Sequence, residues 1–214
     1  DSRARGVHIL LGPGANIYRS PLCGRNFEYY SEDPLLAGRT AAAIINGVES
    51  NDVGTSLKHF CANNQEINRL GNDSRVSQRA LREIYLRNFE IAVQLSQPWT
   101  IMTSYNYLNG RYTSEDKGLL EDVLRGEFGF QGTIMTDWGG GLDAVAQVAA
   151  GNDMQDSLAA NELAEPLFNR FAHVYIETTT ESWGSRLGGS IKGVAIGGAL
   201  FIAGIPLLFW NEGR

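Results

Sequence analysis

The sequence predicts an α/β fold, a partial (β/α)8 TIM-type barrel of parallel βα units, followed by a C-terminal hydrophobic helix. Short apolar segments alternate with amphipathic helical segments from residue 1 to about residue 154, an order typical of βαβ units with a parallel sheet. Polar residues with useful chemistry follow the apolar segments, as they do at the C-terminal ends of barrel strands.

Four apolar segments have a suitable length for buried strands. Helical segments separate them, so the strands are expected to lie parallel. The four segments are VHILL (7–11), SLKHF (56–60), TIMTS (100–104) and TIMT (133–136).

The intervening helices have clear start signals. Asp33 is a predicted N-cap with Pro34 in the first helical position, and this helix is expected to run to about Val48. Ser77 is predicted to cap a second helix, which runs to about Leu95 with apolar residues at helical spacing.

Ser114 is predicted to cap a third helix over residues 115–125, with acids in its first turn and Arg125 in its last. A doubly wound open sheet is the competing fold, because it also binds ligands at the carboxyl ends of its strands. The stretch GPGAN (12–16) lacks the spacing of a GxGxxG phosphate turn, which favours the barrel.

The composition narrows the classes of function. The chain has 214 residues, of which 43% are hydrophobic and 20% charged, with a net charge of -6, as in a globular protein. Acids and bases are interspersed, which argues against a nucleic-acid partner. The cysteines and histidines lack metal-ligand spacing, and a disulfide between the two cysteines stays open. These residues are Cys23, Cys61, His8, His59 and His173.

Polar groups lie at the ends of three predicted strands: Lys58 and His59, then residues 104–106, then Asp137 and Trp138. Burying a charge is costly unless it is paired. Asp137 is therefore either a functional group or the N-cap of a helix that runs through residues 142–150.

Four ordered blocks resemble glycoside hydrolase family 3, the family of β-glucosidases, β-xylosidases and related exo-acting enzymes. The resemblance covers residues 7–154. It implies a barrel domain followed by an α/β sandwich domain, hydrolysis of a β-linked glucoside or other glycoside with retention of configuration, and no cofactor or metal. The blocks are GRNFEYYSEDPLLAG (24–38), LKHFCANNQEINR (57–69), MTSYNYLNG (102–110) and GFQGTIMTDWGG (129–140).

By this resemblance, Asp137 matches the catalytic nucleophile in the family's TDW or SDW motif. A retaining glycosidase needs one ionised carboxylate as nucleophile and one protonated carboxyl as acid, about 5–5.5 Å apart. The nucleophile stays ionised when donors or cations lie nearby, and Lys58, His59 and Arg25 are the candidates.

The resemblance also implies sugar-binding residues. Lys58 and His59 match a KH pair that holds sugar hydroxyls, although a strand-end pair that faces solvent is the alternative. Arg25 and Arg69 match the family's sugar-binding arginines, and an arginine fork can bridge two adjacent hydroxyls.

Three further side chains complete the predicted substrate site. Tyr105 matches a family tyrosine close to the nucleophile, and Met102 is expected on the leaving-group side. Trp138 offers a flat face to a pyranose ring, with ordinary core packing as the alternative. Glu66 is expected to brace the arginines.

The predicted domain organisation has three parts. Residues 1–154 form a partial barrel domain, residues 155–190 a polar linker and residues 191–210 a transmembrane helix. The family's acid/base glutamate and its opening barrel strands have no match here. The chain is therefore expected to be a fragment with the nucleophile half of the site, completed by a homo-oligomer or by a complementing domain.

The C-terminal prediction rests on an uncharged stretch from Gly193 to Trp210. At 1.5 Å per residue it spans roughly 27 Å, close to the hydrocarbon thickness of a bilayer. Residues 173–214 resemble the N-terminal membrane segment of the transmembrane protein 43 family. The chain would be membrane-associated if this helix inserts, whereas a buried helix of a soluble core is the alternative.

Three functions compete at this point. The first is a retaining, exo-acting, β-glucosidase-like glycoside hydrolase fragment. The second is a noncatalytic membrane-anchored protein with a remnant sugar-binding barrel. The third is a substrate-binding module of the open-sheet type.

Overall fold

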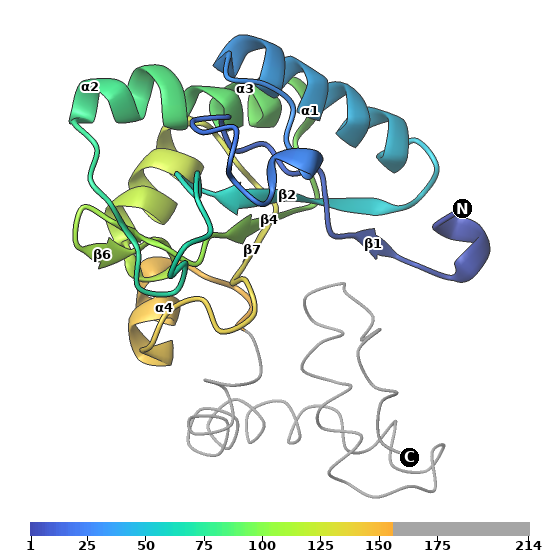
Figure 1. Ribbon diagram of the computed structural model, residues 1–214. Coiled ribbons are helices and arrows are strands. Elements are labelled where there is room, and N and C mark those ends of the chain that lie inside the picture. Colours follow the sequence, from blue (N-terminus) through green and yellow to red (C-terminus); the bar gives the residue numbers. More distant parts are fainter. Residues whose placement is uncertain (156–214) are drawn as a thin grey trace, which may run out of the picture. The chain divides into compact units, whose positions relative to one another are not determined.

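The computed structural model describes residues 1–155, and its centre is a four-stranded parallel sheet (Figure 1). The strand order is β1 (Ile9–Leu10), β2 (Gly54–Phe60), β4 (Thr100–Thr103) and β7 (Thr133–Met135). All four predicted strands are confirmed, with slightly different ends. Neighbouring strands follow one another in chain order without the reversal of a doubly wound sheet, so the sheet has the order of a barrel segment.

Helices and turns connect these strands. A second, smaller sheet of three short strands lies in the order β3-β5-β6. The remaining elements are η1 (Arg3–Arg5), η2 (Asn26–Glu28), α1 (Pro34–Glu49), β3 (Asp73–Ser74), α2 (Gln78–Ala80), η3 (Leu81–Tyr85), α3 (Arg87–Ser96), β5 (Tyr107–Leu108), β6 (Arg111–Tyr112), η4 (Thr113–Glu115), η5 (Gly118–Glu127) and α4 (Ala144–Ala150).

Two of the predicted N-caps are confirmed. The Asp33 carboxylate accepts a hydrogen bond from the backbone N–H of Leu35 at 2.8 Å, and Pro34 begins α1. The Ser77 hydroxyl accepts from the N–H of Ala80 at 3.3 Å. The helix that follows Ser77 is interrupted by a π-helical turn, η3, between α2 and α3.

The predicted cap at Ser114 is wrong. Its hydroxyl donates to the carbonyl oxygen of Gly140 at 2.9 Å, and the residue lies in the 3-10 turn η4. The helix η5 begins later, and the Asp116 carboxylate accepts from the N–H of Leu119 at 3.2 Å. A long-range hydrogen bond has replaced the local cap that the sequence pattern favours.

The two faces of the sheet have different environments. One face packs under α1 and α3, which lie side by side (Figure 1), and its fully buried side chains belong to the hydrophobic core: Leu57, Phe60, Ile101 and Ile134. Because side chains alternate along a strand, Ser56, Met102 and Met135 point to the opposite face. There the Ser56 hydroxyl contacts the sulfur of Met135 at 3.4 Å.

The C-terminal predictions concern a membrane helix and the linker before it. No helix within residues 1–155 has the length and apolarity needed to cross a membrane. The predicted membrane helix at 191–210, the segment 173–214 that resembles transmembrane protein 43, and all but the first residue of the predicted linker at 155–190 lie outside the described residues.

Two glycines of α1 give a matched test of the packing between α1 and α3. A Cβ at Gly38 would lie 2.7 Å from the Asn88 carbonyl oxygen, whereas a Cβ at Gly47 would meet nothing within 4 Å. We predict that Gly38→Ala lowers the free energy of unfolding by about 2–3 kcal/mol through overpacking. Gly47→Ala should raise it by about 0.5–1 kcal/mol through helix propensity. Urea denaturation measures both, and equal effects at the two positions would contradict this packing.

Candidate active site

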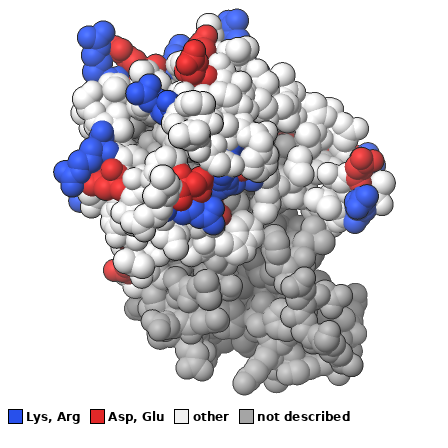
Figure 2. Space-filling model, viewed as in Figure 1, with Lys and Arg blue, Asp and Glu red and all other residues white. Residues whose placement is uncertain are grey.

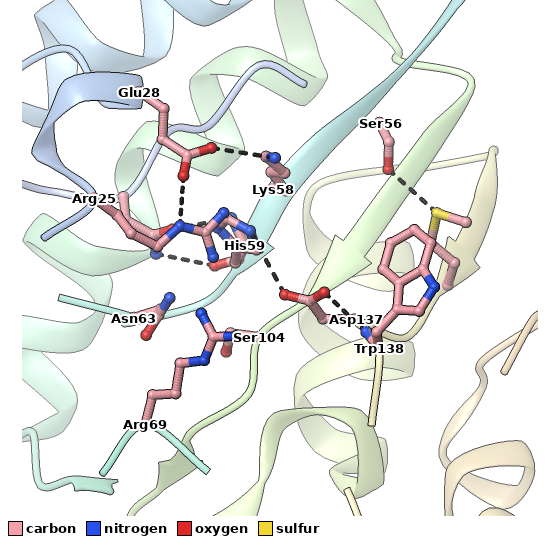
Figure 3. Close-up of polar contacts among 12 residues, drawn as sticks. Arg25, Glu28, Ser56, Lys58, His59, Asn63, Arg69, Ser104, Asp137 and Trp138 are labelled. Carbon is pink, nitrogen blue, oxygen red and sulfur yellow. Dashed lines mark hydrogen bonds and ion pairs between the residues drawn. The ribbon is translucent and has the colours of Figure 1, made fainter. Parts of the chain in front are cut away.

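Residues from three strand ends and from the loop after β1 meet at one edge of the parallel sheet (Figure 3). Asp137 follows β7, and Tyr105 follows β4, while Lys58 and His59 lie near the end of β2. Arg25 comes from the loop after β1. The carboxyl ends of parallel strands lie at the same edge of a barrel, which is why these distant residues converge.

Asp137 carries the buried carboxylate of this site, since only 5% of the residue is exposed. Its Oδ1 accepts the backbone N–H of Trp138 at 2.8 Å, and its Oδ2 lies 3.6 Å from Nε2 of His59. Burial raises the pKa of Asp137 above its usual range, although the Trp138 N–H, Tyr105, Arg25 and Lys58 oppose that rise. These groups favour the ionised form.

The helix-cap explanation of Asp137 is wrong. Helix α4 has Asp143 as its N-cap, and the Asp143 carboxylate accepts from Val145 and Ala146 at 2.9 and 3.0 Å. Asp137 lies outside this helix and is not needed to satisfy its backbone. Its burial therefore requires another explanation.

Glu28 joins two of the predicted sugar-binding cations, and sequence reasoning missed this role. Its carboxylate accepts from Nε of Arg25 and lies 3.1 Å from Nζ of Lys58. Burial alone would raise the pKa of Glu28, but the Arg25 hydrogen bond and the Lys58 charge lower it overall. The spacing of Arg25 and Glu28 in GRNFE, three residues apart within one turn, was the available signal.

Arg69 lies beside Tyr105 and Glu66. Its guanidinium carbon is 4.4 Å from the centre of the Tyr105 ring, a cation–π distance, and it forms an ion pair with Glu66 at 3.2 Å. Glu66 thus braces one of the two arginines. Burial raises the pKa of Tyr105 to about 12, and the Asp137 charge adds to that rise.

His59 is almost fully buried, and residues of the loop after β1 bind both its backbone and its ring. The Asn16 side chain donates to the His59 carbonyl and accepts from its N–H, each at 2.9 Å. The Tyr29 hydroxyl lies 3.1 Å from Nδ1 of the ring. Burial lowers the pKa of His59 well below its usual value, and the charges of the neighbouring Arg25, Lys58 and Arg69 lower it further, so the ring is neutral.

The loop after Asp137 is anchored at several points. The N–H of Gly140 donates to the Asp137 carbonyl at 2.9 Å, and Ser114 and Gln147 both donate to the Gly140 carbonyl at 2.9 Å. The Glu115 carboxylate accepts two further backbone N–H groups of this loop at 2.6 and 2.9 Å. The nucleophile candidate therefore sits on a fixed backbone.

The other two predicted site residues differ in exposure. Met102 is 1% exposed on the face of β4 opposite the main core, and its place on the leaving-group side stays a prediction. Trp138 is 42% exposed, so core packing does not account for it, and it directly follows Asp137 (Figure 3).

Charges on the visible face of the molecule lie in mixed clusters of acids and bases (Figure 2). Exposed ion pairs among the described residues include Arg79–Glu83 and Arg82–Glu127. Cys23 and Cys61 are not joined in a disulfide. Within residues 1–155, no group of three or more His, Cys, Asp or Glu side chains is arranged to hold a metal ion.

The fold and site together define a protein of parallel βα units with a buried carboxylate among cationic side chains at the strand ends. The family described as "Glycosyl hydrolase family 3 N terminal domain" matches residues 1–161. The chain therefore belongs to glycosyl hydrolase family 3, and the resemblance seen in residues 7–154 is confirmed.

Relatives with curated names are similar over most of the chain. An exo-alpha-(1->6)-L-arabinopyranosidase of Bifidobacterium longum is 56% identical over 149 residues, which are 70% of this chain and 20% of that protein. The thermostable beta-glucosidase B of Acetivibrio thermocellus is 47% identical over 183 residues, 79% of this chain and 24% of the relative. The chain thus spans only about a fifth to a quarter of these relatives.

Solved structures agree with this relationship. Beta-glucosidase 3B of Thermotoga neapolitana, in complex with glucose, is 56% identical with a TM-score of 0.73, covering 74% of this chain and 22% of that one. A Bifidobacterium adolescentis GH3 beta-glucosidase is 51% identical with a TM-score of 0.73, covering 76% and 24%.

The neutral, buried state of His59 predicts how stability depends on pH. Its folded pKa is lowered, so the unfolded chain binds the proton first as pH falls through about 6.5, and stability is lost on acidification. When the pH falls from 7.5 to 5.5, this residue should lower the free energy of unfolding by up to about 1.4 kcal/mol. His59→Gln should remove that share of the pH dependence in urea unfolding, and the control His8→Gln should keep it. An unchanged pH dependence in His59→Gln would show that the ring is not held neutral.

Proposed function

We propose that this chain carries the nucleophile half of the active site of a retaining, exo-acting, β-glucosidase-like glycoside hydrolase, with Asp137 as the nucleophile. The observation that carries the proposal is the Asp137 carboxylate itself, buried at the end of β7 and surrounded by groups that favour its ionised form. Burying a carboxylate is costly, and its partners here only offset that cost. A covalent reaction at a sugar carbon explains its place.

In this mechanism an Asp137 oxygen attacks the anomeric carbon of a β-glycoside. The bond between that carbon and the leaving-group oxygen breaks, a separate acid gives the leaving oxygen a proton, and a covalent glycosyl ester forms. Water then attacks the same carbon and gives a proton to the conjugate base of that separate acid, the ester bond breaks, and Asp137 is regenerated as a carboxylate. Two displacements on opposite faces retain the configuration.

The leaving-group acid is proposed to come from outside residues 1–155. Among the described acids beside the site, Glu28 has a lowered pKa because of Arg25 and Lys58, which is the wrong direction for a general acid at neutral pH. Glu66 is paired with Arg69. Another segment or another chain would supply the proton, either as a complementing domain or in a homo-oligomer.

The substrate is proposed to be a neutral pyranoside such as a β-linked glucoside. Arg25, Lys58 and Arg69 are fixed donors for sugar hydroxyls, and Trp138 offers an exposed ring for stacking. The three cations face three carboxylates, those of Glu28, Glu66 and Asp137, and such a balanced site has no excess charge for an ionic substrate. The names of the similar proteins, a beta-glucosidase and an arabinopyranosidase, support an uncharged sugar.

Trapping the covalent intermediate tests the nucleophile. A fluorinated dinitrophenyl β-glucoside needs little acid help because its leaving group is a good one, and the fluorine slows hydrolysis of the ester. We predict that the chain gains one fluoroglucosyl group on the peptide that contains Asp137, as mapped by mass spectrometry. Asp137→Asn should abolish labelling.

Asp143→Asn is the matched control, because Asn also caps helices and Asp143 lies only one short loop away. The Asp143→Asn variant should be labelled to the same extent as the unchanged chain. A label on another peptide, or equal labelling of Asp137→Asn, would overturn the assignment of the nucleophile. Glucose binding without any labelling would favour the noncatalytic sugar-binding alternative.

The brace at Glu28 gives a second prediction. Glu28→Gln should release Arg25 and Lys58 from their fixed positions, since the charge that joins them is lost, and weaken glucose binding about tenfold, or about 1.4 kcal/mol. Isothermal titration measures the Kd. Glu32→Gln, which removes an exposed acid four residues away, should bind glucose as the unchanged chain does, and equal Kd values for both variants would refute the brace.

A further inference from the structure

His59 has a different partner at each ring nitrogen. The Tyr29 hydroxyl lies 3.1 Å from Nδ1, and Oδ2 of Asp137 lies 3.6 Å from Nε2. The histidine and tyrosine rings meet edge to face, at 76°. Because His59 is 1% exposed, water does not compete at these positions, and the protein itself decides which nitrogen carries the proton.

Tyr29 is itself held firmly. It is 4% exposed, and its carbonyl oxygen accepts the Tyr18 hydroxyl at 2.6 Å. Its ring packs against the backbone at Gly14, where a Cβ would lie 2.9 Å from two ring atoms. Burial raises the pKa of the Tyr29 hydroxyl, so that group keeps its proton and can donate it.

The direction of the hydrogen bond between Tyr29 and His59 depends on which ring nitrogen carries the proton. A neutral imidazole has one N–H donor and one acceptor nitrogen. When Tyr29 donates to Nδ1, the ring proton sits on Nε2 and points toward Asp137 and the site. In the opposite tautomer the bare Nε2 lone pair would face the Asp137 carboxylate, and two electron-rich atoms would lie against each other without a proton.

We propose that Tyr29 is a positioning residue that fixes His59 in the Nε2–H tautomer, so that the imidazole presents a neutral N–H donor to the site. Asn16 completes the arrangement by holding the His59 backbone on both sides. Both residues come from the loop after β1, which thus orients a side chain at the end of β2.

A neutral hydrogen-bond donor affects sugar binding and the charge balance of this site. It can bind a sugar hydroxyl without adding a fourth positive charge beside Arg25, Lys58 and Arg69. It also leaves the ionisation of Asp137 to the arginine and lysine. The role in sugar binding rests on the proposed function, whereas the tautomer itself does not.

The tautomer is measured directly by long-range 1H–15N correlation on the full chain at pH 7.5. His59→Gln assigns the signals. We expect a protonated Nε2 and an unprotonated Nδ1 in the unchanged chain, and a shift toward a mixture of tautomers in Tyr29→Phe. Tyr30→Phe, the adjacent tyrosine, should leave the signals unchanged. A protonated Nδ1 in the unchanged chain would overturn the proposal, as would an unaltered spectrum in Tyr29→Phe.

Asp137→Asn separates the two partners of the ring and needs no change at Tyr29. If Tyr29 fixes the tautomer, the Nε2–H form persists in this variant, whereas a mixture would assign the effect to the carboxylate and refute the role of Tyr29. The tautomer measured in Asp137→Asn tests the role of Tyr29 even if Tyr29→Phe does not fold.

Function is read separately. Tyr29→Phe should raise the Kd for glucose about tenfold, as expected for a misdirected hydrogen bond of about 1.4 kcal/mol. An altered tautomer with an unchanged Kd would overturn the role of Tyr29 in sugar binding. If the unchanged chain shows the Nε2–H tautomer but is not labelled at Asp137 by the fluorinated glucoside, only the proposed function is contradicted.

Discussion

The burial of the Asp137 carboxylate is the constraint on which the rest of this site depends. Desolvation of a charge is costly and raises the pKa of this group. The N–H of Trp138 and the cations Arg25 and Lys58 offset that cost. The cations would repel one another without their own counter-charge, and Glu28 supplies it. Each element of the site therefore compensates for a consequence of burying one carboxylate.

The fold makes this compensation possible by bringing strand ends together. Parallel strands in chain order place β2, β4 and β7 side by side, so that residues far apart in sequence share one edge. Helices α1 and α3 cover the apolar face of the sheet, while the loops after the strands remain available for polar residues. The Glu115 carboxylate and the Ser114 hydroxyl then fix the loop that carries Asp137.

Much of the fold could be predicted from sequence because its signals are local. The caps at Asp33 and Ser77 and the strand segments are read within a few residues. The predicted cap at Ser114 was wrong because its hydroxyl donates to the carbonyl of Gly140, 26 residues away. In the site, Asn16 and Tyr29 were missed since their partner, His59, lies 43 and 30 residues away, and no local pattern records such a pairing.

The ionisation of Asp137 can be followed most directly by a carbon-13 NMR titration of its carboxyl group in the full chain, assigned with Asp137→Asn. An ordinary aspartate titrates near pH 3.9. The account predicts a higher midpoint for Asp137, with the group still ionised at neutral pH. A midpoint at the ordinary value would mean that the carboxylate is solvated and not desolvated among these cations. A carboxyl that is still protonated at neutral pH would mean that the surrounding donors do not keep it ready to attack a sugar.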